Sequence, residues 1–323
     1  MSEPQSTIPF FDADQIRGAT PWPRLIEAIA QGFVSTHHAP DRHIHDLAVP
    51  GEVDATALLM PAWIEGEIYG VKLATIFPSN NKAGARAVNA IYVLFDGMNG
   101  KPLALMDGGE ITARRTAATS ALAARYLARE DARTLLVVGT GRLPPLLAQA
   151  HKAVRDIDTV LVWGRNGEKA EKLAQRIGAE LDVETGAVKD LEVGVRQADI
   201  VSCATISREA LVLGDWLEPG THLDLVGAFT PLMRETDAKA VTRSAVFIDT
   251  LGGAKAEAGD LIHAINEAAF GWDDVVADLP ALCSGAHKGR SSADEITLFK
   301  SVGAAIEDLV AARLTYKAST PTG

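Results

Sequence analysis

Residues 135–138 (LLVV) form an apolar run that passes directly into the turn sequence GTGRLP at residues 139–144. A strand, a glycine turn and then a helix is the arrangement that dinucleotide-binding folds place around a pyrophosphate. Gly139 permits the tight turn, and Gly141 lets the backbone approach the pyrophosphate at the start of the helix. Pro144 stands where glycine or alanine is usual, but a first helical turn tolerates proline because its missing N–H would have no partner there. The alternative is a simple structural turn.

The alternation of strands and helices around this turn favours the cofactor loop. A long alanine-rich helix is expected at 113–128, and a closing helix at 294–316 that returns to the first part of the chain. Regular alternation with short apolar strands predicts a doubly wound parallel sheet, an α/β fold of the Rossmann type. The expected strands lie at 134–138, 159–162, 200–204, 221–226 and 245–248, with a weaker one near 180–183, and the helices between them at 146–154, 167–177 and 191–197.

The first hundred residues have a different pattern. Apolar residues spaced as on one helix face predict a helix from Asp12 to Phe33. Short strands then follow one another with turn residues and without intervening helices, which indicates an antiparallel sheet. The change near residue 112, in a chain of 323 residues, indicates two domains. The strands are expected at 47–49, 57–61, 68–77, 87–95 and 102–106.

Composition excludes several classes of protein. With 47% hydrophobic and 23% charged residues the chain is not disordered. A net charge of −11 argues against a broad nucleic-acid surface, although one basic pocket for a small anion is compatible with it. Cys203 and Cys283 are too few for a disulfide framework or a cysteine zinc site. The N-terminus lacks a secretory signal pattern, and no apolar run approaches the ~20 residues that span a bilayer, so we expect a soluble cytoplasmic protein with no membrane partner.

Arg165 indicates the kind of nicotinamide cofactor. It follows the second strand of the alternation, about 20 residues after the glycine loop, where NAD-preferring sites place a carboxylate. A guanidinium binds the 2′-phosphate of NADP, which a carboxylate would repel. We therefore expect NADP(H), with NAD(H) as the second cofactor and a surface arginine as the alternative interpretation. Further cofactor candidates are Arg142, Asn166 and Lys169 near this phosphate, and the strand-end residues Gly139, Thr140, Gly141, Leu143, Gly164, Cys203, Ala204, Thr205, Val226, Gly227 and Ala228.

Four stretches resemble, in order, signature segments of the ornithine cyclodeaminase/μ-crystallin family. They are residues 72–78 (KLATIFP), 112–123 (TARRTAATSALA), 227–235 (GAFTPLMRE) and 289–303 (GRSSADEITLFKSVG). The loop 139–145 (GTGRLPP) resembles that of family members that act as Δ1-pyrroline-2-carboxylate reductases, which accounts for its proline. The resemblance extends from about residue 10 to residue 315 and is specific to the family more than to a substrate.

The resemblance implies two domains and a homodimer. Residues 116–301 would form an NAD(P)-binding Rossmann domain, and residues 1–115 with 302–323 an α+β domain for substrate binding and dimerisation. Family substrates are small α-amino or α-imino acids, and the motif positions imply that Arg42, Lys72 and Arg115 hold the carboxylate. Cations inside apolar patterns are costly unless they meet an anion, which agrees with this role. Arg114 is expected to face outward, and the family pattern adds Asn89 as a cofactor contact. Ser292, in the segment GRSS, is a further candidate on the nicotinamide side.

Phe229 distinguishes this chain from the cyclodeaminase branch. That branch has an aspartate two residues before the proline of this segment, where it serves deamination and ring closure. Phenylalanine can carry out no acid–base step. Cyclodeamination also needs NAD⁺ regenerated within one cycle, whereas Arg165 indicates NADPH. Both departures favour a net reduction.

The sequence therefore suggests an NADPH-dependent reductase of cyclic ketimine acids. The expected reaction converts Δ1-pyrroline-2-carboxylate to L-proline, with Δ1-piperideine-2-carboxylate to L-pipecolate as a second activity. Lys72 and Arg115 are the catalytic candidates, and Lys72 is a better proton donor to the imine than His45 if one is needed. We expect no metal, since His43 and His45 have no carboxylate pair at ligand spacing. The alternatives are an ornithine or lysine cyclodeaminase, an alanine or arginine dehydrogenase of the same family, or a non-catalytic NADPH-dependent binding protein.

Overall fold

A computed structural model describes residues 7–83 and 85–319 of the chain. The chain divides into two compact units, unit 1 (Met1–Arg115 with Ala304–Gly323) and unit 2 (Thr116–Gly303). Residues 1–6 belong to the N-terminal stretch that lacks a signal pattern, and they lie outside the described part. Among the described residues, no helix is both long enough and apolar enough to cross a bilayer.

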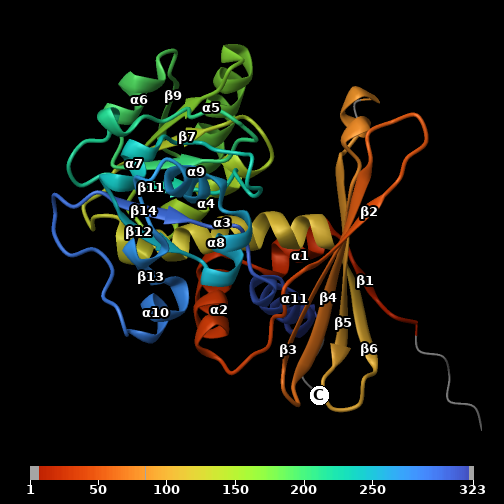
Figure 1. Cartoon of the computed structure of the whole chain (residues 1–323). Coiled ribbons are helices and arrows are strands. Elements are labelled where there is room, and N and C mark those ends of the chain that lie inside the picture. The colour runs from red at the N-terminus through yellow and green to blue at the C-terminus, as the bar shows by residue number, and fades with distance from the viewer. Residues whose placement is uncertain (1–6, 84, 320–323) are drawn as a thin grey trace, which may run out of the picture. The chain divides into compact units, whose positions relative to one another are not determined.

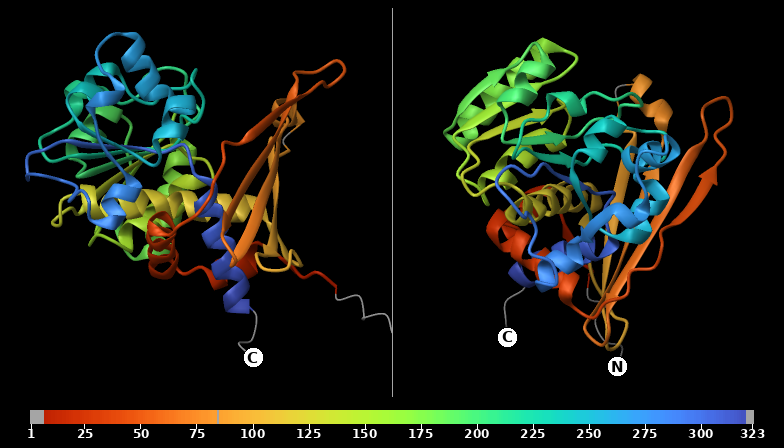
Figure 2. Two further views of the ribbon diagram at one scale, coloured as in Figure 1. Left: turned by 60° about the horizontal axis from the view of Figure 1, so that its bottom comes forward. Right: turned by 60° about the vertical axis from the view of Figure 1, so that its left-hand side comes forward.

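Unit 1 contains a six-stranded sheet in the order β1-β6-β5-β4-β3-β2. Neighbouring strands are antiparallel, as predicted, except that the short β1 pairs parallel with β6. Figures 1 and 2 show the sheet in orange and yellow with the blue C-terminal helix α11 along it. The strands are β1 Phe10–Phe11, β2 His43–Leu47, β3 Ala55–Ile64, β4 Ile68–Ile76, β5 Val88–Asp96 and β6 Pro102–Asp107, and the helices are α1 Ala13–Ala19, α2 Trp22–Val34 and α11 Ala305–Ser319, with α3 Gly108–Leu127 crossing into unit 2.

The single helix expected from Asp12 to Phe33 is wrong, because the chain forms two helices. Asp12 caps α1 by accepting a hydrogen bond from Gln15 N at 2.9 Å. Helix α1 ends at Ala19 with Thr20 as its C-cap, and Pro21 is the N-cap of α2. Proline has no N–H to continue a helical ladder, so the same apolar spacing is divided between two axes.

The two faces of the six-stranded sheet differ in burial. Met60, Tyr92 and Met106 on one face are almost fully buried among residues of the helices. Their strand neighbours point to the opposite face, because side chains alternate along a strand. This outer face is also apolar but only partly buried, and its central residues are Leu59, Pro61, Trp63, Tyr69, Val71, Leu73, Ile91, Val93, Phe95, Leu103 and Leu105.

Unit 2 is the predicted doubly wound α/β fold. Its eight strands are all parallel, in the order β13-β12-β14-β11-β10-β7-β8-β9. The chain moves from β7 through β8 to β9 and then returns to β10 on the other side of β7, so right-handed connections place α4 and α5 on one face and α6 on the other. The strands are β7 Thr134–Val138, β8 Thr159–Trp163, β9 Glu184–Ala187, β10 Ile200–Cys203, β11 His222–Leu225, β12 Ala245–Ile248, β13 Val275–Asp278 and β14 Thr297–Lys300, and the helices are α4 Leu143–Lys152, α5 Gly167–Leu181, α6 Leu191–Gln197, α7 Ala238–Thr242, α8 Leu251–Glu257, α9 Gly259–Asn266 and α10 Leu279–Ser284.

Two expected elements of this region are corrected. The closing helix does not begin at residue 294, because residues 297–300 form the buried strand β14 between β11 and β12, and α11 begins only at Ala305. The strand expected at 180–183 is also wrong, since α5 continues to Leu181 and β9 begins at Glu184. Asp249 binds the residues that follow β14, because its Oδ2 accepts hydrogen bonds from Val302 N at 2.7 Å and Gly303 N at 2.6 Å. These two residues accordingly belong to unit 2.

Candidate functional site

Lys72 and Arg115 converge on one buried carboxylate in unit 1. Lys72 pairs with Tyr92 and Met60 in the sheet, on the face covered by helices, and only 4% of it is exposed. Its Nζ lies 2.7 Å from Oδ2 of Asp308, a residue of α11. Arg115, on α3, donates through Nε to Oδ1 of the same carboxylate at 3.1 Å. The structure thus brings together two of the predicted carboxylate-binding residues, through an aspartate that sequence reasoning missed.

Glu307 completes this group. Its Oε2 accepts from Arg115 Nη1 at 2.7 Å, and its Oε1 accepts from Ala304 N at 3.2 Å. Glu307 and Asp308 are fully buried in the first turn of α11, where the helix dipole favours negative charge. Two adjacent acidic residues in an otherwise apolar helix sequence were the available signal, because buried carboxylates need cations. We call Lys72, Arg115, Glu307 and Asp308 the charge cluster.

The charge cluster retains donors for an anion. An ammonium carries three N–H groups and a guanidinium five. Among the described contacts, Lys72 uses one N–H and Arg115 uses two. The remaining N–H groups of these buried cations are sufficient for both oxygens of a small carboxylate.

Burial and charge shift the titration of the cluster. Burial lowers the pKa of Lys72 to about 8, assisted by the positive charges of Arg115 and Arg42, although Asp308 opposes this shift. Burial alone would raise the pKa of Asp308, but Arg115 and Lys72 outweigh it and hold that pKa below its usual value. Asp308 is therefore ionised at neutral pH, while Lys72 is a cation that can release a proton in a physiological range.

The other predicted residues of unit 1 are placed differently. Arg42 is half-buried before β2, and its charge reaches Lys72 electrostatically. Arg114 does not face outward as expected, because its Nε donates to Thr20 Oγ1 at 2.7 Å and its guanidinium lies 4.2 Å from the centre of the Trp22 ring. A guanidinium can be buried in this way because an aromatic face and an oxygen replace water.

Asn89, His43 and His45 are not brought to the charge cluster. Asn89 shares the outer face with its partner Thr75, opposite to Lys72, and donates to Arg86 O at 3.4 Å. Both histidines lie exposed on the edge strand β2. Among the described residues, no group of histidine, cysteine or acidic side chains is arranged to hold a metal ion.

The glycine loop of unit 2 has the geometry of a pyrophosphate site. Gly139 has φ +128°, and a Cβ there would lie 2.8 Å from Ala204 O, so only glycine fits. Its N–H donates to Trp163 O at 2.8 Å, which joins the carboxyl ends of β7 and β8. Around Gly141, by contrast, a Cβ would meet nothing within 4 Å. This open space at the start of α4 fits an approaching pyrophosphate.

Pro144 supports this loop. It lies buried in the first turn of α4, and its Cγ is 3.5 Å from the position of a Cβ on Gly139. The proline ring therefore packs against Gly139 at the position where dinucleotide-binding loops usually have glycine or alanine. The residues that could present N–H groups to a phosphate are Thr140, Gly141, Arg142 and Leu143.

The strand ends that follow the glycine loop lie along the same carboxyl edge. Arg165 is exposed directly after β8, and Asn166 caps α5 by accepting from Lys169 N at 2.9 Å. Ala204 N donates to Val138 O at 2.9 Å, so the end of β10 meets the end of β7. Ligands of open parallel sheets bind along this edge. Gly164, Thr205, Val226, Gly227 and Ala228 also lie there, while burial raises the pKa of the Cys203 thiol and leaves only its backbone for a cofactor.

Ser292 is not brought to this edge. It precedes β14 in a segment where Arg290 donates a hydrogen bond to Gly220 O at 2.9 Å, at the amino ends of β11 and β14.

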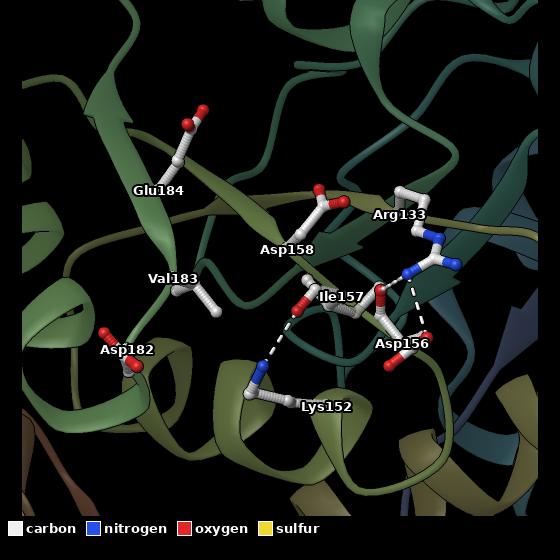
Figure 3. A pocket seen from close by; sticks show the side chains of 8 residues that line it. All are labelled: Arg133, Lys152, Asp156, Ile157, Asp158, Asp182, Val183 and Glu184. Atoms are coloured by element: carbon white, nitrogen blue, oxygen red, sulfur yellow. Dashed lines mark hydrogen bonds and ion pairs between the residues drawn. The ribbon is translucent and has the colours of Figure 1, made fainter.

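A hollow of about 510 Å³ opens at the amino edge of the same sheet, before β7, β8 and β9 (Figure 3). It is far from the strand ends that carry the glycine loop, so it is not the cofactor site. Its lining residues are Arg133, Lys152, Asp156, Ile157, Asp158, Asp182, Val183 and Glu184.

Comparison with known proteins agrees with these features. Residues 12–322 match the model of the ornithine cyclodeaminase/mu-crystallin family. The chain is 38% identical to a Δ1-pyrroline-2-carboxylate reductase of Paracoccus denitrificans, over 97% of both chains. Among solved structures, it superposes on Thermococcus litoralis Δ1-pyrroline-2-carboxylate reductase in complex with NADH and L-proline with a TM-score of 0.91 at 33% identity, over 97% of both chains. An archaeal alanine dehydrogenase dimer with bound NAD gives a TM-score of 0.88 at 26% identity, over 97% of this chain and 96% of that one. The chain therefore belongs to the ornithine cyclodeaminase/mu-crystallin family.

Proposed function

We propose that this protein is an NADPH-dependent reductase of cyclic ketimine acids, with Δ1-pyrroline-2-carboxylate as its main substrate and Δ1-piperideine-2-carboxylate as a second. The observation that carries the proposal is the charge cluster, in which Lys72 and Arg115 are buried, fixed by Asp308 and still able to donate. The Paracoccus and Thermococcus relatives are both named Δ1-pyrroline-2-carboxylate reductase, and this chain matches almost the full length of each. Unit 1 would bind the substrate and unit 2 the cofactor.

The residues of unit 1 would orient and protonate the substrate. Lys72 and Arg115, with Arg42 nearby, bind the carboxylate and so fix the direction in which the imine carbon points, an effect that can contribute several kcal/mol. Nicotinamide, when bound, supplies the hydride for that carbon. The imine nitrogen needs a proton to accept it, and Lys72, with a pKa of about 8, holds one at Nζ at neutral pH.

The residues of unit 2 fit a dinucleotide. The space around Gly141 accepts the pyrophosphate, and Thr140, Arg142 and Leu143 surround it. Arg165 supports NADPH, because it is an exposed guanidinium at the position that contacts the adenosine ribose. The Thermococcus relative holds NADH, so NADH is the second cofactor to measure.

Phe229 argues against the cyclodeaminase alternative. It is 38% exposed in the loop after β11 and carries no group that accepts a proton. A cyclodeaminase needs such a group to remove and return protons during ring closure.

The outer face of the sheet in unit 1 supports a homodimer. Eleven central residues of this face are apolar or aromatic, and Leu73 is 39% exposed. A contiguous apolar face that stays partly exposed is typical of a protein–protein interface. A second copy would bury it through the same face, as isologous dimers do. The related archaeal alanine dehydrogenase is a dimer.

Steady-state kinetics test the proposal. The purified protein is given pyrroline-2-carboxylate or piperideine-2-carboxylate with NADPH or NADH, and ornithine or alanine with NAD⁺ in parallel. We expect imine reduction with the highest kcat/KM for NADPH and pyrroline-2-carboxylate. Turnover of ornithine or alanine without imine reduction would assign the protein to another branch, and cofactor binding without any turnover would make it a binding protein.

A further inference from the structure

Glu235 is a fully buried carboxylate of unit 2 that the proposed reaction does not use. It accepts four hydrogen bonds from two neighbouring loops. Its Oε1 accepts from Thr205 N at 2.6 Å and from Thr205 Oγ1 at 2.8 Å. Its Oε2 accepts from Gly227 N at 2.7 Å and from Ala228 N at 3.3 Å. An ionised carboxylate has about four acceptor positions, so these contacts saturate it.

The two loops follow the carboxyl ends of β10 and β11. β10 is adjacent to β7, whose glycine loop fits the pyrophosphate, and β11 is the next strand. A dinucleotide with its pyrophosphate at β7 and its adenosine end near Arg165, after β8, extends in the opposite direction over β10 and β11. The loops that Glu235 joins therefore lie where the nicotinamide half would rest.

The main chains of the two loops are in close contact. A Cβ on Gly227 would lie 2.0 Å from Thr205 O and 2.5 Å from Glu235 Oε1, so the two loops touch through their main chains. The backbone of Glu235 is fixed in turn, because its N–H donates to Asp260 Oδ1 at 2.6 Å. The other oxygen of Asp260 forms an ion pair with Lys300 Nζ at 2.9 Å, and both side chains are fully buried.

We infer that Glu235 is a positioning residue for the nicotinamide half of the cofactor, holding the loops after β10 and β11 as one rigid surface. The inference rests on the proposed cofactor site. Glu235 does not touch the cofactor itself, and it acts through Thr205 and Gly227. It explains why the segment 227–235 begins with glycine and ends with glutamate.

The test compares two ligands that differ only in nicotinamide. NADPH and 2′-phospho-ADP-ribose are titrated onto wild type and Glu235→Gln. The amide turns an N–H₂ group toward either Thr205 N or Gly227 N, so one loop loses its acceptor. We expect the Kd of NADPH to rise about tenfold, the size of one lost hydrogen bond to a charged group, while the Kd of 2′-phospho-ADP-ribose stays within about twofold.

Two further variants sharpen the result. Thr205→Val has nearly the same shape and removes the Oγ1 donor to Glu235, together with the long hydrogen bond that Oγ1 accepts from Ser207 N at 3.3 Å. It should therefore weaken NADPH binding in the same direction by about threefold. Asp199→Asn is the control. Asp199 also holds backbone N–H groups, from Arg133 at 2.8 Å and Thr134 at 2.9 Å, but at the amino ends of the sheet. Asp199→Asn should change neither the Kd of NADPH nor the ratio between the Kd values of NADPH and 2′-phospho-ADP-ribose.

An equal loss of affinity for both ligands in Glu235→Gln, or no loss for either, would overturn the inference. An effect of Asp199→Asn equal to that of Glu235→Gln would overturn it as well. Because the measurement is cofactor binding, failure of the wild type to reduce cyclic imines would count against the proposed substrate and not against the role of Glu235.

Discussion

Lys72 Nζ lies 2.7 Å from Asp308 Oδ2, although 236 positions of sequence separate the two residues. The contact joins the middle strand β4 to the C-terminal helix α11 on the buried side of the sheet. It fixes an ammonium whose pKa burial lowers to about 8, and so it sets the pH at which the charge cluster loses a cation.

The first prediction concerns this pH. The probe is pyrrole-2-carboxylate, a planar analogue of the proposed substrate that has no imine. Its own charge is constant between about pH 6 and pH 10, so any change of its Kd in this range comes from the protein. Protonated Lys72 binds it and neutral Lys72 does not, so its Kd should be constant below about pH 8 and rise about tenfold per pH unit above it. Isothermal titration at several pH values measures this. In Lys72→Arg the rise should disappear, and a wild-type Kd that stays flat to pH 10 would contradict the role of Lys72.

The second prediction concerns Asp308→Asn. Removing the carboxylate leaves Lys72 and Arg115 with one buried anion, Glu307, which contacts Arg115. We expect a loss of about 3–5 kcal/mol in the free energy of unfolding, the cost of breaking a buried ion pair. The pKa of Lys72 should fall below about 8, since Asp308 normally raises it, and the loss of pyrrole-2-carboxylate binding should begin at lower pH. Glu307→Gln is the matched control, because it removes a charge of the cluster without touching Lys72, and an identical pH shift there would refute the specific role of Asp308.

The third prediction separates folding from cofactor binding at the glycine loop. Alanine at Gly141 would meet no protein atom within 4 Å, so the melting temperature of Gly141→Ala should match that of the wild type. The added methyl group would occupy the space of the pyrophosphate, and the Kd of NADPH should rise at least tenfold. Gly167→Ala, at the start of α5, also adds a methyl group into open space and should leave the Kd unchanged. Tight binding of NADPH to Gly141→Ala would remove this loop from the cofactor site.

The fourth prediction tests the cofactor preference. Arg165→Ala should raise the KM for NADPH by about 10–100-fold, the value of a charge-assisted hydrogen bond to the 2′-phosphate, and change the KM for NADH little. Lys172→Ala removes the same charge from an exposed position of α5 and serves as control. If the wild type has the same kcat/KM with NADH as with NADPH, and Arg165→Ala changes neither KM, then Arg165 is only a surface residue.

The fifth prediction concerns assembly. Val71 lies at the centre of the outer face of the sheet. A glutamate there would place a charge in the dimer interface, and Val71→Glu should sediment as a monomer where the wild type sediments as a dimer. Met98→Glu changes a residue that is 79% exposed in the β5–β6 turn, and it should leave the dimer intact. A wild-type monomer at micromolar concentration would contradict the proposed interface.

Local patterns were sufficient to predict much of the fold. The run LLVV before GTG predicts β7 and its loop because the apolar residues, the glycines and the following helix are contiguous. The sequence pattern predicts a helix where β14 forms, since four residues carry too little periodicity and the buried Lys300 resembles a surface residue. The break between α1 and α2 was missed although Pro21 marks it.

The charge cluster could be predicted only in part. Lys72 and Arg115 stand out as cations in apolar patterns, and a family motif surrounds each. Asp308 and Glu235 do not, because a carboxylate in a helix or loop is ordinarily solvated and only tertiary packing buries it. The burial of Arg114 is likewise invisible in the sequence, since the Trp22 ring that covers it lies on another helix.

The position of β14 bears on how this chain folds during synthesis. It follows all the other strands of the described residues in the sequence, yet it lies between β11 and β12 in the sheet of unit 2. The helix that follows it, α11, delivers Glu307 and Asp308 to unit 1. Because a ribosome releases the N-terminal parts first, β11 and β12 lack the strand between them, and Lys72 and Arg115 lack their carboxylates, until β14 and α11 have emerged.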